Sequence, residues 1–191
     1  LLNYDNEHDH LIKFDKLLPN GKSFFTSFST NFNDIGLVCD FLIQHGVDPN
    51  QCDETGLYPL QYAIIINSID LVTSLVNTEK IVYTQLKHGF TYLHLAAQNK
   101  DSAILSFLLG KNIIDINSEN DIGETPFIEA SKYKRIDNIN ILFQKENIDY
   151  LHCNKNGKDA LDFFVSLPQD EKNSLKEDKE KFYNALISII N

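Results

Sequence analysis

The 191 residues include 17 basic and 27 acidic side chains, which give a formal net charge of −10. This acidity argues against a nucleic-acid partner, because proteins that bind phosphate backbones usually present a basic face. Arg135 is the single arginine, which is a further argument against binding to nucleic acid. A hydrophobic share of 42% indicates a folded globular chain, and no apolar run approaches the roughly 20 residues that a membrane-spanning helix needs.

The three cysteines, Cys39, Cys52 and Cys153, are odd in number and form no C-x-x-C motif. This usage is typical of reduced thiols in an intracellular protein, so we expect structural cysteines and a cytoplasmic location. The sequence begins Leu1-Leu2 and contains no methionine. We therefore interpret it as a piece of a longer protein.

The first predicted element is a capping segment over residues 1–17, where apolar residues suggest a helix that covers one end of the fold. Five glycines then recur along the chain at intervals of 35, 33, 34 and 34 residues: Gly21, Gly56, Gly89, Gly123 and Gly157. A similar phrase follows each glycine: the clearer copies read GLYPLQYAI, GFTYLHLAA, GETPFIEAS and GKDALDFFV, and GKSFFTSFS after Gly21 is the weakest. A fixed period of this length predicts a solenoid of stacked units.

Each unit reads as a tight turn followed by two helices. The glycine suits a turn that needs positive φ, and Thr125 can cap the next helix with Pro126 at its first position. Small alanines such as Ala96 allow first helices to approach closely, and a second helix follows with apolar spacing, as in Ile104, Leu105 and Leu108. Neither helix of a pair can bury its apolar face alone, so the pairs must stack.

These phrases resemble the ankyrin-repeat family, whose motif is D-x-x-G-x-T-P-L-H-x-A-A. Gly89, Thr91, Leu93 and His94 match it in one copy, and Thr125-Pro126 in another. The resemblance covers about residues 18–167 and implies an all-α solenoid of four to five repeats that begin near residues 18, 53, 86, 120 and 154. It also implies that His94 makes a hydrogen bond between adjacent repeats.

The last predicted element is a C-terminal capping helix within residues 168–191. Pro168 falls where the fifth repeat should turn between its helices, and a charged stretch leads into the apolar segment FYNALISII. We expect this segment to cover the last repeat.

No residues form a convincing catalytic, cofactor or metal site. His8 and His10 lack the further ligands that a structural zinc site needs. Phosphate-binding, dinucleotide-binding and hydrolase motifs are missing from the sequence, and carboxylate pairs such as Asp121 with Glu124 are expected by chance. We therefore predict a monomeric protein that is not an enzyme and binds no cofactor.

The resemblance implies a partner-binding surface on the concave side, formed by hairpin tips and the exposed edge of the first helices. Transferring those positions to this chain selects ten residues: Leu57, Ile65, Ile66, Phe90, Gln98, Asn99, Glu124, Lys132, Tyr133 and Arg135. The apolar members are expected either to bind a partner or to pack within the solenoid. The basic residues near Tyr133 would attract an acidic partner segment.

The predicted function is binding of another protein by the repeat stack. The alternative is that the chain recruits a substrate or target for a larger enzyme or effector whose catalytic domain lies elsewhere. A host-directed bacterial effector has a similar composition, and such a protein would act in the host cytoplasm.

Overall fold

The computed structural model describes residues 17–27, 34–83, 85–163, 181–184 and 188. Nearly all of the N-terminal capping segment predicted over residues 1–17, with His8 and His10, lies outside these ranges. Most of the C-terminal cap predicted over residues 168–191 lies outside them as well.

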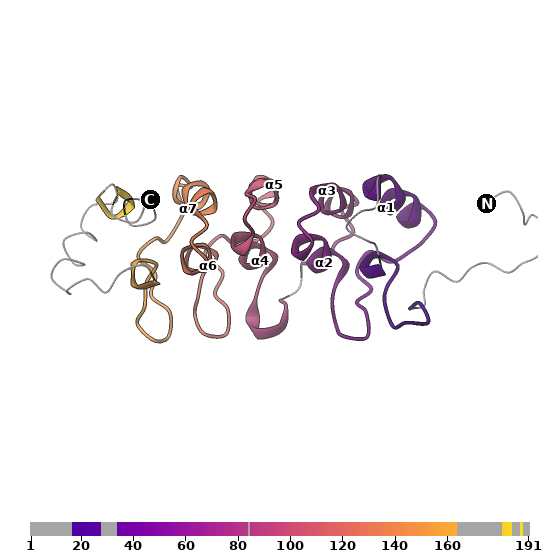
Figure 1. The fold of residues 1–191 in the computed structure, drawn as a ribbon, viewed down its shortest axis with the longest axis horizontal. Coiled ribbons are helices and arrows are strands. Elements are labelled where there is room, and N and C mark those ends of the chain that lie inside the picture. Colours follow the sequence, from indigo (N-terminus) through magenta and orange to yellow (C-terminus); the bar gives the residue numbers. More distant parts are fainter. Residues whose placement is uncertain (1–16, 28–33, 84, 164–180, 185–187, 189–191) are drawn as a thin grey trace, which may run out of the picture.

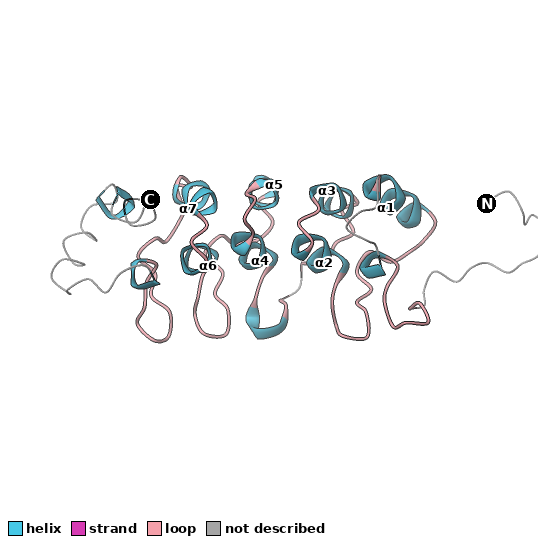
Figure 2. Cartoon of the chain, viewed as in Figure 1, coloured by secondary structure: helices cyan, strands magenta, loops and turns pink. Residues whose placement is uncertain are grey.

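Helices in two rows build an elongated solenoid (Figure 1). The lower row holds the first helix of each repeat: α2 (Pro59–Ile65), α4 (Tyr92–Gln98) and α6 (Pro126–Lys132). The upper row holds the second helices: α1 (Ile35–Gln44), α3 (Ile69–Asn77), α5 (Ala103–Lys111) and α7 (Ile136–Phe143). Figure 2 shows helices and loops, and the described ranges contain no strand. The predicted all-α repeat solenoid is confirmed.

Helix α6 begins at its predicted capping residue. Thr125 accepts a hydrogen bond from the Ile128 backbone N–H at 3.4 Å, and Pro126 occupies the first helical position. In the end repeats the described part of the first helix is a 3-10 turn, η1 (Phe25–Ser27) or η3 (Leu161–Phe163).

A tight loop precedes each first helix, and all five loops share one hydrogen-bond pattern. The backbone N–H of the loop's opening residue donates to the carbonyl four positions later, as Asn120 does to Glu124 at 3.0 Å. The glycine inside the loop has positive φ, and at Gly89 a Cβ atom would lie 2.7 Å from the Asp121 backbone nitrogen. Glycine is therefore required there by both backbone conformation and space.

The loop before α4 differs from its neighbours. In the loops that open with Asp53, Asn120 and Asn154, the opening side chain accepts backbone N–H bonds within the loop. Leu86 opens the loop before α4 and offers no acceptor, and this loop contains the 3-10 turn η2 (Lys87–Gly89). The difference in geometry lies in His88, which has a positive φ of 60° before the loop glycine, whereas the residues before the other four loop glycines do not.

One continuous apolar core runs between the two helix rows. The alanines at the helix contacts are fully buried, including Ala63, Ala96 and Ala130. Phe182 extends this core at the C-terminal end, where its ring lies 6.4 Å from the ring of Phe143. This contact supports the predicted C-terminal cap, which otherwise stays a prediction.

Candidate partner-binding surface

The ten predicted residues fall at three equivalent positions of consecutive repeats, with Arg135 in addition. The hairpin position, just after the loop glycine, holds Leu57, Phe90 and Glu124. The last residue of the first helix is Ile65, Gln98 or Lys132, and the C-cap that follows is Ile66, Asn99 or Tyr133. These three rows are referred to below as the hairpin, helix-end and C-cap rows.

The hairpin row is mostly occupied by contacts within the solenoid. Leu57 and Phe90 are half-buried, and the Phe90 ring packs against the core with its centroid 5.4 Å from that of His94. Glu124 is 3% exposed. The structure therefore offers part of Phe90 and little of Glu124 to a partner.

Glu124 belongs to a buried polar cluster that joins three repeats. Its carboxylate accepts a hydrogen bond from Lys132 Nζ at 2.8 Å, and Asn154 of the next repeat donates to it at 3.4 Å. Glu129, fully buried on the same helix as Lys132, accepts a hydrogen bond from Gln98 Nε2 of the preceding repeat at 2.8 Å. The Lys132 ammonium is therefore held by carboxylates of its own repeat.

The two carboxyl groups of this cluster differ in acidity. Burial raises the pKa of Glu129 to about 7, and its hydrogen bond with Glu124 adds to the shift. Burial also acts on Glu124, but the hydrogen bonds from Glu129 and Lys132 outweigh it and lower the pKa of Glu124. Below about pH 7 the pair therefore shares one proton, which Glu129 holds.

Sequence reasoning did not select Glu129. An acid at this position stands out, since the equivalent residues of the two preceding repeats are the aromatic Tyr62 and the aliphatic Leu95. A comparison of the copies position by position would have found it.

His94 has the predicted role in linking repeats. Its Nδ1 accepts a hydrogen bond from the Thr91 backbone N–H at 3.0 Å, and its Nε2 lies 2.8 Å from the Glu124 carbonyl oxygen. Burial lowers the pKa of His94, so the ring is neutral and Nε2 carries the proton that it donates to Glu124. The predicted inter-repeat hydrogen bond is confirmed.

Arg135 and Asn99 also bind neighbouring repeats. The guanidinium Nε of Arg135 donates to the carbonyl of Gln98 at 2.6 Å. Asn99 Nδ2 donates to the carbonyl of Ile64 at 2.9 Å. Arg135, the N-cap of α7, thus binds to α4, and Asn99 joins the end of α4 to α2, which limits what these two side chains can offer to a partner.

Apolar side chains remain exposed on the same edge of the solenoid. Ile65 is 56% exposed and Tyr133 is 45% exposed, whereas Ile66 is half-buried against the core. Ile122, at the hairpin tip before α6, is 47% exposed. The Tyr133 ring lies 6.0 Å from the Arg135 guanidinium carbon, which holds the two side chains near each other.

The described residues show neither metal-binding nor membrane-spanning features. No group of three or more His, Cys, Asp or Glu side chains in these ranges is placed to hold a metal ion. No helix in the same ranges is both long and apolar enough to cross a membrane. The thiol of Cys39 is fully buried, and burial raises its pKa to about 12, which makes it unreactive.

Two curated proteins share part of this sequence. Alpha-latrocrustotoxin-Lt1a of Latrodectus tredecimguttatus is 39% identical over 85 residues, which are 44% of this chain and 6% of the toxin. An ankyrin-repeat protein of Acanthamoeba polyphaga mimivirus is 29% identical over 116 residues, which are 60% of this chain and 11% of that protein. The chain thus spans about a tenth or less of the length of these relatives.

A family model describing three copies of the ankyrin repeat matches residues 28–120 and 93–171. Ankyrin repeats generally mediate protein–protein interaction and are typically non-catalytic. The two matches together cover well over half of the sequence, with the repeat geometry described above. The chain therefore belongs to the ankyrin-repeat family.

Proposed function

We propose that this chain binds another protein through the hairpin tips and the exposed edge of its first helices. The exposure of Ile65, Ile122 and Tyr133 carries the proposal. Ile65 lies at the end of α2, and Ile122 and Tyr133 lie at the hairpin and end of α6, two repeats further on, where water rather than core covers them. Apolar and aromatic groups of this kind are the usual anchors of protein interfaces.

The partner's anchoring contacts are expected to be more apolar than ionic. Lys132 is paired with Glu124 at 2.8 Å, and the Arg135 Nε is bound to a backbone carbonyl. Both residues retain positive charge that can steer an acidic segment toward the surface, and added salt would weaken that contribution. Lys134, which is exposed beside them, is the basic side chain best placed for direct contact.

The first experiment is capture of a partner from cell lysate with identification by mass spectrometry. The affinity of the identified partner is then measured for Tyr133→Ala and Phe90→Ala, each expected to weaken binding by on the order of 1–2 kcal/mol. Lys145→Ala is the matched control, because Lys145 is exposed just after α7 in the second-helix row. Loss of binding in the control but not in the two aromatic variants would place the interface elsewhere.

A second candidate function is recruitment of a target for a larger enzyme or effector. The small share of each relative that this chain matches favours it, since both relatives are much longer than the matched segment. Sequencing the natural gene on both sides of this segment would test the idea. A flanking catalytic domain, whose action on the captured partner requires Tyr133, would support recruitment over simple binding.

A further inference from the structure

Two asparagines connect the loops that follow the second helices. Asn117 Nδ2 donates to the Asn147 carbonyl at 2.7 Å, and its Oδ1 accepts from the Asp149 backbone N–H at 2.9 Å. Asn50 makes the same pair of bonds to Lys80 and Val82, at 2.9 and 2.8 Å. In each case one carboxamide binds a carbonyl 30 residues ahead and an N–H 32 residues ahead, an arrangement called the asparagine bridge below.

The repeat between these two lacks the bridge. Asn50 and Asn117 each lie three residues before the residue that opens a hairpin loop, and Tyr83 holds that position before Leu86. A bridge from residue 83 would reach the Ile113 carbonyl and the Asp115 N–H. Within the described chain neither backbone group has a hydrogen-bond partner. The fold therefore leaves open a carbonyl and an N–H at positions that one carboxamide fills in the neighbouring repeats.

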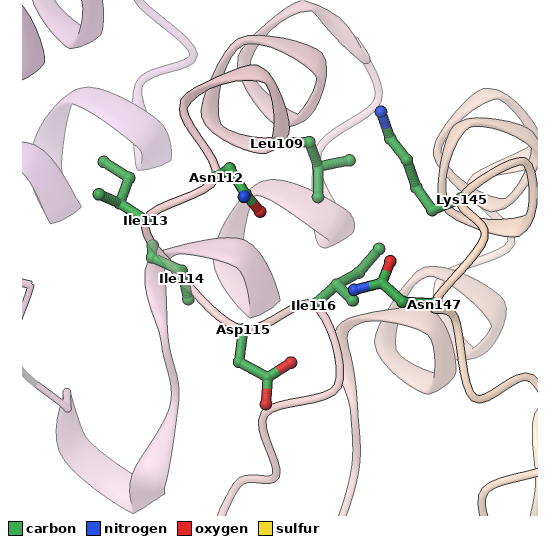
Figure 3. Close-up of a pocket in the computed structure, with 8 residues that line it drawn as sticks. All are labelled: Leu109, Asn112, Ile113, Ile114, Asp115, Ile116, Lys145 and Asn147. Atoms are coloured by element: carbon green, nitrogen blue, oxygen red, sulfur yellow. The ribbon is translucent and has the colours of Figure 1, made fainter.

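A groove of about 280 Å³ lies at this position, with Tyr83 and Ile113 among its walls. Ile113 is 47% exposed. Figure 3 draws a neighbouring pocket, which shares Ile113, Ile114 and Asp115 with this groove. In that view Ile113 points away from Leu109 and Lys145. The two residues that carry the open backbone groups, Ile113 and Asp115, thus line the groove together with apolar side chains.

The charged side chains of the groove are both acidic. Asp115 and Glu119 line it and are exposed, and no basic side chain is among its lining residues. The Asp115 carboxylate already accepts a bond from the Asn117 backbone N–H at 2.9 Å, but it keeps its negative charge. A ligand with positive charge beside its carboxamide would therefore fit this groove better than a neutral or acidic one.

We propose that this groove binds the side-chain carboxamide of an asparagine in a basic segment of a partner protein. The carboxamide NH2 donates to the Ile113 carbonyl, its oxygen accepts from the Asp115 N–H, and flanking lysine or arginine side chains pair with Asp115 and Glu119. None of the ten residues of the predicted hairpin and first-helix surface lines this groove. The site is thus additional to the proposed interface, and either can fail without the other.

The test uses the tripeptide acetyl-Lys-Asn-Lys with an N-methylamide end, so that asparagine supplies its sole primary carboxamide. The control peptide replaces Asn with Leu, which has a similar shape and the same charge but no hydrogen-bonding groups. The peptides are titrated at millimolar concentration into the ¹⁵N-labelled protein. We expect the Asn peptide to shift the Asp115 amide resonance and to bind about tenfold more tightly than the Leu peptide, as two added hydrogen bonds imply.

Two variants at one position provide the second readout. Tyr83→Asn should form the missing bridge within the protein, slow hydrogen exchange of the Asp115 amide and abolish the response to the Asn peptide. Tyr83→Leu removes the ring but supplies no carboxamide, so it should keep the response.

Equal binding of the Asn and Leu peptides, or the lack of any Asp115 response, would overturn the proposal. So would a Tyr83→Asn variant that still responds like the natural protein. If Tyr83→Asn does not fold, the comparison of the two peptides on the natural protein decides the question alone.

Discussion

At the scale of single residues, the buried pair Glu124 and Glu129 shows how the solenoid uses acidic groups. Two carboxylates cannot both be charged in one buried site without a large cost, so one holds a proton. Glu129 Oε1 is buried without a hydrogen-bond donor among the described residues, and the nearest cation, Lys132 Nζ, lies 3.7 Å away. Protonation of Glu129 allows it to donate to Glu124, which explains why Glu129 is the neutral member.

This arrangement makes stability depend on pH. The pKa of Glu129 is raised from 4.5 to about 7 on folding. The stability that the protonated carboxyl group contributes is therefore fully present below about pH 4.5 and is lost as the pH rises through 7. In the natural protein the free energy of unfolding should fall as the pH rises and Glu129 ionises. We expect Glu129→Gln to make this fall smaller by on the order of 1–3 kcal/mol, because glutamine keeps a donor and has no charge to bury. The measurement is the free energy of unfolding by urea between pH 5 and 8.

Glu146→Gln serves as the control, because Glu146 is exposed. It should leave the pH profile unchanged in this range. A Glu129→Gln profile parallel to that of the natural protein would show that Glu129 is ionised in the fold.

The alanines test the packing between first helices. Ala96 is fully buried, so Ala96→Leu should overpack the stack and cost roughly 1–3 kcal/mol. Ala103→Leu is the control, since Ala103 begins α5 and is exposed. Thermal melts of both variants would measure the effect, and equal melting temperatures would contradict this account of the helix contact.

Residue roles that depend on a short local phrase were predictable from sequence. Thr125 and Pro126 stand next to the helix that they begin, and His94 follows its Thr91 partner by three residues. The role of Glu129 was not predictable in this way, because its partners Gln98 and Glu124 come together only after the repeats stack. Its low exposure results from packing, which charge alone does not reveal.

At the scale of elements, the C-terminal end of α4 is closed by the next repeat. Asn138, fully buried in α7, donates its carboxamide N–H groups to the carbonyls of Ala97 and Asn99 at 3.0 and 2.9 Å. The last carbonyls of a helix have no partner within the helix, so a buried helix end needs such donors. One side chain therefore stabilises α4 and fixes its distance from α7.

Replacing Asn138 with leucine should destabilise the protein by about 1–3 kcal/mol, because the buried carbonyls at the end of α4 lose their donor. The change keeps a similar side-chain volume, so the loss reports hydrogen bonding rather than a cavity. Gln144→Leu, at the exposed C-cap of α7, is the control and should have little effect. Urea unfolding measures both, and similar midpoints for the two variants would contradict the capping role.

At the scale of the whole molecule, the contacts between hairpin tips are not equivalent along the stack. A backbone hydrogen bond joins tips at three junctions: Glu54 to Gly21, Asp121 to His88, and Lys155 to Ile122. Between the hairpins of Gly56 and Gly89, the link among the described residues is the Lys87 side chain, whose Nζ donates to the Thr55 carbonyl at 2.9 Å.

The histidine link is also missing at this junction, as it is at the junctions of Gly21 with Gly56 and of Gly123 with Gly157, where Thr26 and Ile128 hold the position of His94. Gln61 holds the position of His94 in α2, and its side chain accepts from the Tyr58 backbone N–H within its own repeat. The repeat period could be predicted from the glycine spacing, because one phrase recurs. The differences between junctions could not be predicted from the sequence, since they depend on which groups of neighbouring hairpin tips meet after stacking.

A solenoid with one weaker junction should open there first, because each repeat contacts only its neighbours. Lys87→Ala removes the tip link and should lower the opening free energy of α2 and α3 by about 0.5–1 kcal/mol, with α6 and α7 unchanged. Native-state hydrogen exchange in low urea measures these helices separately. Lys155→Ala is the matched control: its Nζ donates to the Asp121 carbonyl at 2.8 Å, but its backbone bond to Ile122 remains, so neither pair of helices should change. An equal drop across all four helices in Lys87→Ala would instead mean that the repeats unfold as one cooperative unit and that the tip link limits the stability of the whole stack.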